Sequence, residues 1–352
     1  MVHRSYFRGM TTHEDNMARR ILRHSKWERS SRRAAVTVGV VALCAACGDP
    51  TASEGSRLEA LPYDAIGPGL LVFERSSVGH GLYLANGASR TAQMLLSDAF
   101  VRGAVLSPNG KQLAYSRLYG PLLLTQTDLA VRDLTTGVET RLAQDTLHQG
   151  MPTWAPNGQE LVYPSNGAAF YLFDYWQTSA SATGASARRN LTQLRITGQL
   201  ICPYGELAIP AVLSVRDQLA WLCRGRVYTK SAGADGSALA VSGPDGNPVA
   251  VAWSPDGLRL AYSAFFGDQL VVRVVSRDGG APTTIASVAS TPSNWAHFNL
   301  NSLCWTADGS RLFFNATRGN ESSHVWVVRS DGSGLLQITS RPGVRDFNVS
   351  CT

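Results

Sequence analysis

A short pattern of apolar and polar positions recurs along the chain. Each copy has an aromatic residue or Leu, a small polar residue, Pro or Ala, Asp or Asn, and then Gly. A run of alternating apolar and polar residues follows. Four copies align: L-S-P-N-G-K-Q-L-A-Y-S at 106–116, W-A-P-N-G-Q-E-L-V-Y-P at 154–164, W-S-P-D-G-L-R-L-A-Y-S at 253–263 and W-T-A-D-G-S-R-L-F-F-N at 305–315. Pro fixes φ in the turn, Gly accepts a positive φ, and alternation with period two is typical of a strand, so each copy predicts a β-hairpin.

A second hairpin follows in several copies. Residues 270–276 lead through Asp278-Gly279-Gly280 to 283–286, and the same arrangement joins 325–329 to 335–339 and 129–134 to 138–142. Four short antiparallel strands in each repeat are typical of one blade of a β-propeller.

The spacing of the turns predicts the number of blades. Pro108 and Pro156 are 48 residues apart, and Pro255 and Ala307 are 52 apart. Pro156 and Pro255 are 99 residues apart, which is two repeats, with a degenerate copy at 211–222. Residues 69–75, 81–85 and 92–97 supply three strands of a sixth blade, and 345–352 supply its missing first strand. We therefore expect an all-β fold, a six-bladed β-propeller of four-stranded antiparallel blades closed by the C-terminal strand joining the N-terminal blade.

These motifs resemble those of TolB-like six-bladed β-propellers, which are also found as the propeller half of prolyl-oligopeptidase-type peptidases. The resemblance covers residues 58–352 and implies a partner protein at the cell envelope. Residues 48–352 amount to about 51 residues for each blade, which leaves no room for a second globular domain. We therefore expect a TolB-type propeller and not TolB itself, which carries an α/β domain before its propeller.

The first 46 residues have the features of an export signal. An apolar run of 13 residues at 34–46 follows Arg29, Arg32 and Arg33, and it is too short to span a bilayer. The sequence L-C-A-A-C at 43–47 resembles the lipobox of bacterial lipoproteins, in which the final cysteine carries the lipid. We expect a lipoprotein signal peptide at 1–46, lipidation of Cys47, a flexible tether at 47–57 and the propeller at 58–352. An ordinary secretory signal that is cut nearby is the alternative. Gly48 lacks the acidic character that retains lipoproteins in the inner membrane, which favours the outer membrane.

The net charge of +6 does not indicate nucleic-acid binding. Residues 1–46 contain nine Arg and Lys against three Asp and Glu, so this segment carries the whole excess and the rest of the chain is neutral. We expect no nucleic-acid partner, and contact with the membrane through the lipid anchor alone.

Four cysteines remain for the propeller: Cys202, Cys223, Cys304 and Cys351. An exported protein can join them in two disulfides, and three pairings are possible. We prefer Cys202 with Cys223 and Cys304 with Cys351, which would fasten the closing strand to the fifth blade. Buried free thiols are the alternative.

The longer connections of the blades share one face of a propeller, and loops on a rigid scaffold often bind partners. This binding face contains a set of candidate residues with aromatic, imidazole or guanidinium side chains. They are Arg117, Tyr119, His148, Trp295, His297, Phe298 and Arg318.

The sequence contains no G-x-S-x-G or H-E-x-x-H motif, and His80, His148, His297 and His324 do not lie at metal-binding spacing. We expect these histidines in loops or at the surface, and we expect no catalytic residue, metal or cofactor. The sequence predicts a lipid-anchored, periplasm-facing propeller that binds an envelope protein without catalysis. The alternative is a propeller that binds or processes a glycan through its central channel, with clustered acids or histidines at the channel mouth.

Overall fold

The computed structural model describes residues 58–76, 80–98, 100–118, 127–142, 149–165, 174–181, 188–192, 211–223, 225–232, 238–242, 246–290, 302–318 and 322–352. All of them belong to one compact unit, Thr51–Thr352. The regular structure in these ranges is β-strand, apart from the short helix α2 (Tyr63–Ile66). None of the described helices is long and apolar enough to cross a membrane.

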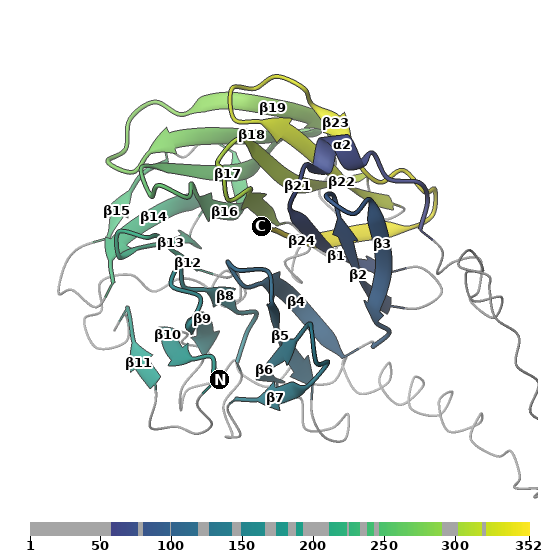
Figure 1. Cartoon of the computed structure of the whole chain (residues 1–352). Helices are drawn as coiled ribbons and strands as arrows, with labels where there is room; N and C mark the ends of the chain where they lie inside the picture. The colour runs from purple at the N-terminus through teal and green to yellow at the C-terminus, as the bar shows by residue number, and fades with distance from the viewer. Residues whose placement is uncertain are drawn as a thin grey trace, which may run out of the picture. The chain divides into compact units, whose positions relative to one another are not determined.

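Four separate antiparallel sheets have four strands each and stand around a common centre as the blades of a propeller (Figure 1). Their strands follow one another in space as they do in the sequence. The strands are β4 (Val101–Leu106), β5 (Gln112–Leu118), β6 (Thr127–Asp133) and β7 (Glu139–Arg141); β8 (Thr153–Trp154), β9 (Glu160–Ser165), β10 (Asp174–Ser179) and β11 (Arg188–Asn190); β12 (Val212–Leu213), β13 (Gln218–Cys223), β14 (Arg226–Ser231) and β15 (Leu239–Ala240); β16 (Asn247–Trp253), β17 (Arg259–Phe266), β18 (Gln269–Ser276) and β19 (Thr283–Ala289).

The remaining strands form one eight-stranded sheet. They are β20 (Leu303–Trp305), β21 (Arg311–Arg318), β22 (Ser322–Arg329), β23 (Leu336–Gln337), β24 (Arg345–Cys351), β1 (Leu70–Ser76), β2 (His80–Asn86) and β3 (Thr91–Leu96). The structure therefore separates four blades as sheets of their own, where six were expected. The difference arises at one place, because a parallel pairing of Ser323 with Arg345 joins β22 to β24.

The two ends of the propeller chain pair with each other, as the sequence predicted. Strand β24 lies antiparallel to β1, with Leu71 opposite Cys351 and Val72 opposite Ser350. The backbone N–H of Thr352 donates to the carbonyl oxygen of Leu70 at 3.0 Å, which extends the ladder to the last residue. The edge of β1 is therefore covered by the chain's own C-terminus.

The turn of the W-S-P-D-G repeat is held by its own side chains. The Asp256 carboxylate accepts hydrogen bonds from the Ser254 hydroxyl at 2.5 Å and from the backbone N–H of Leu258 at 2.9 Å. Gly257 has φ +66°, the left-handed conformation that glycine accepts without strain. The same contacts occur around Asp308, where Thr306 takes the place of the serine. The repeat is therefore a self-contained hairpin turn.

The degenerate repeat also forms a blade, since β12 and β13 pair as its first hairpin. In its turn the Ser214 hydroxyl itself accepts from the backbone N–H groups of Arg216 and Gln218, and Asp217 stands at φ +57° where the other turns have glycine. Asp tolerates this conformation better than most residues, so the turn survives although the sequence motif does not.

The tryptophans of the repeat join neighbouring blades. The indole Nε1–H of Trp154, Trp253 and Trp305 donates to the backbone oxygen of Val105, Val212 and Ala252, respectively, each in the preceding sheet. The apolar core is divided in the same way: one cluster joins β16–β19 to β20–β22, for example through Phe265 and Phe314. Blades are thus held to one another mainly by apolar packing.

Candidate functional site

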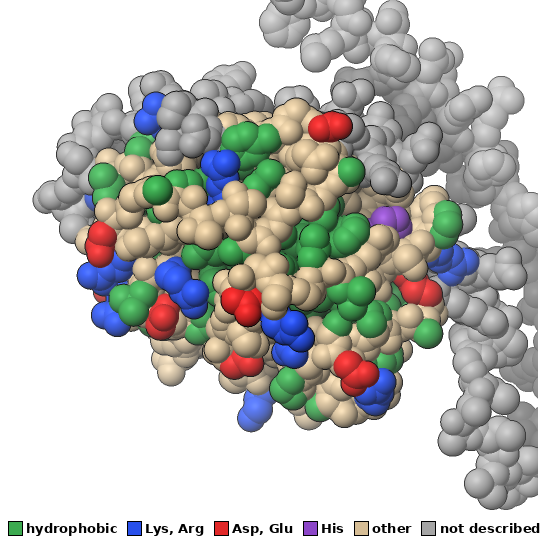
Figure 2. Space-filling view, turned by 90° about the horizontal axis from the view of Figure 1, so that it is seen from above, with side chains coloured by type: hydrophobic (Ala, Val, Ile, Leu, Met, Phe, Trp, Pro, Cys, Tyr) green, Lys and Arg blue, Asp and Glu red, His purple; other side chains and the backbone are tan. Residues whose placement is uncertain are grey.

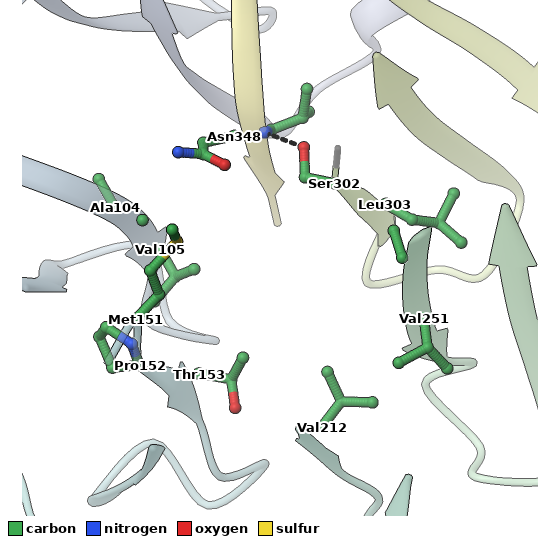
Figure 3. A pocket seen from close by; sticks show the side chains of 13 residues that line it. Ala104, Val105, Met151, Pro152, Thr153, Val212, Val251, Ser302, Leu303 and Asn348 are labelled. Atoms are coloured by element: carbon green, nitrogen blue, oxygen red, sulfur yellow. Dashed lines mark hydrogen bonds between the residues drawn. The ribbon is translucent and has the colours of Figure 1, made fainter. Parts of the chain in front are cut away.

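The innermost strands surround a small cavity at the centre of the ring, which is the candidate site for a ligand in the channel (Figure 3). Its volume is about 90 Å³. Residues of β4, β8, β12, β16, β20 and β24 line it, together with the two residues before β8 and the one before β20: Gly103, Ala104, Val105, Met151, Pro152, Thr153, Val212, Ala250, Val251, Ser302, Leu303, Asn348 and Val349.

The cavity wall is mostly apolar. Its three polar side chains already bond within the protein. Ser302 accepts from the backbone N–H of Val349 (Figure 3) and donates to Asn315. Thr153 donates to the carbonyl oxygen of Ala211, and Asn348 donates to Glu74. None of the lining residues is ionisable. Such a wall suits an apolar contact better than a charged ligand.

Two of the innermost strands bulge where they face the cavity. The register of β24 against β1 shifts between Val72 and Glu74, and Asn348 in the bulge has φ +51°. The register of β4 shifts between Arg102 and Val105, and Gly103 has φ +62°. A Cβ at Gly103 would lie 2.4 Å from Cγ of Met151, so glycine is required there. Bulges of this kind redirect side chains at the rim of closed sheets.

Behind Asn348 lies a buried polar network that involves Glu74. The Glu74 side chain is fully buried and accepts from Asn348 Nδ2 at 2.9 Å and from the backbone N–H of Ala104 at 3.3 Å. Its other oxygen lies 3.0 Å from Nε2 of His80. This network joins β1, β2, β4 and β24 at the point where the ring closes.

The hydrogen bonds of His80 determine how many protons the pair holds. Its Nδ1 lies 2.8 Å from the carbonyl oxygen of Asp98, which can accept but not donate, so Nδ1 carries a hydrogen. The contact between Nε2 and the Glu74 carboxyl group also needs one proton between the two atoms. The pair is therefore either imidazolium with carboxylate or neutral imidazole with a carboxylic acid. Both ring nitrogens are engaged by the protein.

A second charged cluster lies next to this network. The Arg75 guanidinium binds Asp346 at 2.7 and 2.8 Å and Glu59 at 3.0 and 3.1 Å, with Arg75 and Asp346 buried. Burial opposes the charge of Arg75, but the bonds to the two carboxylates outweigh it and raise the pKa of Arg75. Burial is the largest influence on Glu59 and acts to raise its pKa, but the hydrogen bonds from Arg75 and the backbone, together with the charge of Arg75, lower the pKa overall. These three residues tie the segment before β1, β1 itself and β24 together.

The structure joins Cys304 and Cys351 in a disulfide, with their Cα atoms 6.0 Å apart. This is the pair that the sequence analysis preferred, and it links β20 to the closing strand. Cys223 is also disulfide-bonded. Cys202 and Cys47 lie outside the described residues.

Of the predicted binding-face residues, the structure describes Arg117 and Arg318, which lie at the ends of β5 and β21. Arg117 is engaged in ion pairs with Asp98 and Glu139, both at 2.7 Å. The other predicted binding-face residues lie outside the described residues: Tyr119, His148, Trp295, His297 and Phe298.

Glu74 was not among the predicted site residues, and the prediction that His80 and His324 lie in loops or at the surface is wrong. Both histidines lie in strands, β2 and β22, and are half-buried. No motif surrounds Glu74 or His80, and Asn348 reaches Glu74 from 274 residues away in the sequence. Among the described residues, no three or more His, Cys, Asp and Glu side chains are grouped so as to hold a metal ion.

The geometry defines a class: this is a β-propeller with a narrow, apolar centre. No family model matches the chain, and no curated protein matches it. Solved structures are similar in fold. TolB from Acinetobacter baumannii is 15% identical with a TM-score of 0.59, over 80% of this chain and 66% of that one. A structure titled as a nidogen/laminin complex is 13% identical with a TM-score of 0.57, over 80% and 98%. A putative TolB from Agrobacterium tumefaciens is 11% identical with a TM-score of 0.54, over 81% and 99%. The fold is therefore that of TolB-like β-propellers.

Proposed function

We propose that this protein is a non-catalytic propeller that binds another protein at the cell envelope. The observation that carries the proposal is the character of the central cavity. It is apolar, it holds about 90 Å³, and its lining includes no ionisable side chain. Sites for small ligands usually hold roughly 300–1,000 Å³ and converge several polar groups on the ligand.

The fold supports the same proposal. A similar structure is that of a protein–protein complex, nidogen with laminin, and two others are TolB or a putative TolB. Fold alone does not determine function, so these likenesses support binding without identifying a partner.

We also propose that the eight-stranded sheet is two blades, β20–β23 and β24 with β1–β3, which gives six in all. In the strand ladder of the described residues, β22 and β24 share one parallel pairing, that of Ser323 with Arg345. Six strands from successive parts of the chain line the cavity, and six apolar clusters of described residues lie between neighbouring groups of strands.

The alternative is a propeller that binds or processes a glycan through its channel. The observation in its favour is the Glu74–His80 pair, which reaches the cavity through Asn348. Against it, both nitrogens of His80 are occupied, so neither is available to a substrate without rearrangement.

The proposed location rests on the sequence: export by the leader at 1–46, a lipid on Cys47 and attachment to the outer membrane facing the periplasm. A Cys47→Ala variant should leave the membrane fraction. Retention of that variant in the membrane would contradict the lipid anchor.

Photo-crosslinking in native envelopes tests both the partner and the face. The loop between β17 and β18 and the end of β5 lie on the predicted binding face, so a photo-reactive residue replaces Asp268 or Leu118. Asn109 and Asp308, in the tight turns at the opposite ends of the strands, are matched controls. We expect a defined protein adduct from the first pair and none from the second. Protein adducts from Asn109 or Asp308 alone would contradict the proposal. Retention of a glycan with no protein adduct from any of the four positions would contradict it too.

A further inference from the structure

A second cavity lies on the rim of the propeller, away from the channel. It occupies about 440 Å³ between the outermost strand of one blade, β19, and strands β21, β22 and the β23 region. Its lining residues are Ser287, Val288, Ala289, Ala316, Ser322, His324, Trp326, Leu335 and Gln337. Figure 2 views the molecule from the side where β18, β19 and β23 lie in Figure 1, and hydrophobic side chains gather near the middle of that face. This volume is within the usual range for small-ligand sites.

The cavity has one apolar wall and one hydrogen-bonding wall. Trp326 packs with the cluster between the two blades and also lines the cavity. Gln337 lies opposite Trp326 on the neighbouring strand and donates to the carbonyl oxygen of Thr339, and Ser287 donates to Gln269. None of the lining residues is Asp, Glu, Lys or Arg.

The backbone of β19 adds donors and acceptors to the second wall. The N–H of Ser290 donates to Asp268, which makes Asp268 and Ser290 a hydrogen-bonded pair. Orientation alternates along an antiparallel strand, so the N–H and C=O groups of Ser287 and Ala289 point away from β18. No described strand pairs with β19 on that side.

The ends of the cavity are closed along β19. A Cβ at Gly332 would lie 3.4 Å from the carbonyl oxygen of Ile285, so the turn before β23 lies against the strand there. At the other end the Ser290 hydroxyl donates to the carbonyl oxygen of Thr317 at 2.6 Å and accepts from its N–H at 3.0 Å. The open stretch is about four residues, roughly 13 Å of strand, so an extended peptide has no exit at either end.

The lining of the rim cavity indicates which kind of ligand it can bind. A charged ligand would lose water without gaining an Asp, Glu, Lys or Arg side chain as a counter-ion. A purely apolar ligand would leave the outward backbone groups of Ser287 and Ala289 without partners. We propose that this rim cavity is a binding site for a neutral saccharide of one or two rings. The C–H face of a sugar ring would pack on Trp326, and its hydroxyl groups would bond to Gln337, Ser287 and the β19 backbone. This site is separate from the predicted binding face, and the proposal does not depend on the proposed protein partner.

The test is titration of the folded protein with maltose, cellobiose, lactose and chitobiose, followed by saturation-transfer NMR. We expect at least one of them to bind saturably, with a dissociation constant on the order of 1 mM or tighter. Trp326→Leu and Gln337→Leu should weaken that binding at least tenfold. Ala289→Phe should do the same by filling the cavity from an exposed position, and it removes no core contact.

The matched control is Trp176→Leu. Trp176 is half-buried on β10 and lies opposite Asn190 of the outer strand, as Trp326 lies opposite Gln337. It does not line the rim cavity, so this variant should bind as the wild type does.

Saturable binding of none of the four sugars up to about 20 mM would overturn the proposal. Binding that is unchanged in folded Ala289→Phe and Gln337→Leu would place the sugar elsewhere and overturn it too. Binding of an uncharged tetrapeptide in place of every sugar would point instead to strand addition at β19.

Discussion

The blade β16–β19 and the closing group of strands, β24 with β1–β3, have the same four-strand architecture but different means of support. In β16–β19 no charged side chain is buried, and the apolar core is Ala, Val, Leu, Ile, Phe, Tyr and Trp. In the closing group Glu74, Arg75 and Asp346 are buried, and a disulfide fastens Cys351 to the neighbouring strand.

The difference follows from how far apart the paired segments lie in the sequence. The hairpins of β16–β19 close over a few residues, so their turns set the register. Arg75 and Asp346 are 271 residues apart, and closing so long a loop costs more conformational entropy. No short turn joins β24 to β1, so directional contacts must select the register of this pair. These contacts are the bidentate ion pair, the hydrogen bonds of Glu74 and the disulfide.

The largest predicted effect is the loss of the Arg75 guanidinium. Arg75→Met leaves the Asp346 carboxylate buried without its partner, so we expect the free energy of unfolding in urea to fall by about 3–5 kcal/mol. The control is Arg277→Met, which removes an exposed pair with Asp278 in the repeat blade and should cost less than about 1 kcal/mol. Equal effects of the two substitutions would remove the contrast between the regions.

Loss of the disulfide between Cys304 and Cys351 should have the second-largest effect on stability. The bond joins residues 47 apart, and replacing Cys304 and Cys351 together with Ala should lower the free energy of unfolding by about 2–4 kcal/mol. The comparison is made in oxidising buffer, so that the disulfide of Cys223 stays intact. A double variant as stable as the wild type would show that the strand needs no such fastening.

Substitutions in the turns should change the stability of the repeat blades in opposite directions. Gly257→Ala places a Cβ at φ +66° and 3.1 Å from Cγ2 of Val215, so we expect a loss of about 1–2 kcal/mol. The reverse change, Asp217→Gly in the degenerate turn at φ +57°, should stabilise the protein by several tenths of a kcal/mol. Thermal or urea unfolding measures both changes in the free energy of unfolding. Changes of the same sign in the two variants would contradict this explanation of the turns.

The smallest predicted effect is a pH dependence of the turns. Hydrogen bonds from the Thr306 hydroxyl and from Ser310 lower the pKa of Asp308 to about 2, below its usual value of 3.8. A carboxyl group with a lowered folded-state pKa stabilises the fold above the unfolded value and loses that contribution as the pH falls through the folded one. Wild type should therefore lose stability between about pH 4 and 2, and Asp308→Asn should lose less in that window. An identical acid profile for both proteins would contradict this role.

The repeat was predictable because its determinants are local. Pro255, Asp256 and Gly257 lie within one turn, and Trp253 recurs at the spacing of a blade, so the hairpins and the closing strand followed from the sequence. The Glu74–His80–Asn348 network was not predictable, because its members lie on different strands and no motif surrounds them. The join between β22 and β24 depends on one pairing of Ser323 with Arg345, which no pattern of residues indicates.

Hydrogen exchange of the C-terminal peptide, 345–352, followed by mass spectrometry, tests the central claim most directly. Closure of the ring by β24 predicts that this peptide is protected to the same degree as peptides from β21 and β22, because its amides bond to β1. Exchange within seconds, as in a free chain end, would show that the C-terminus does not pair with β1 and would contradict the account.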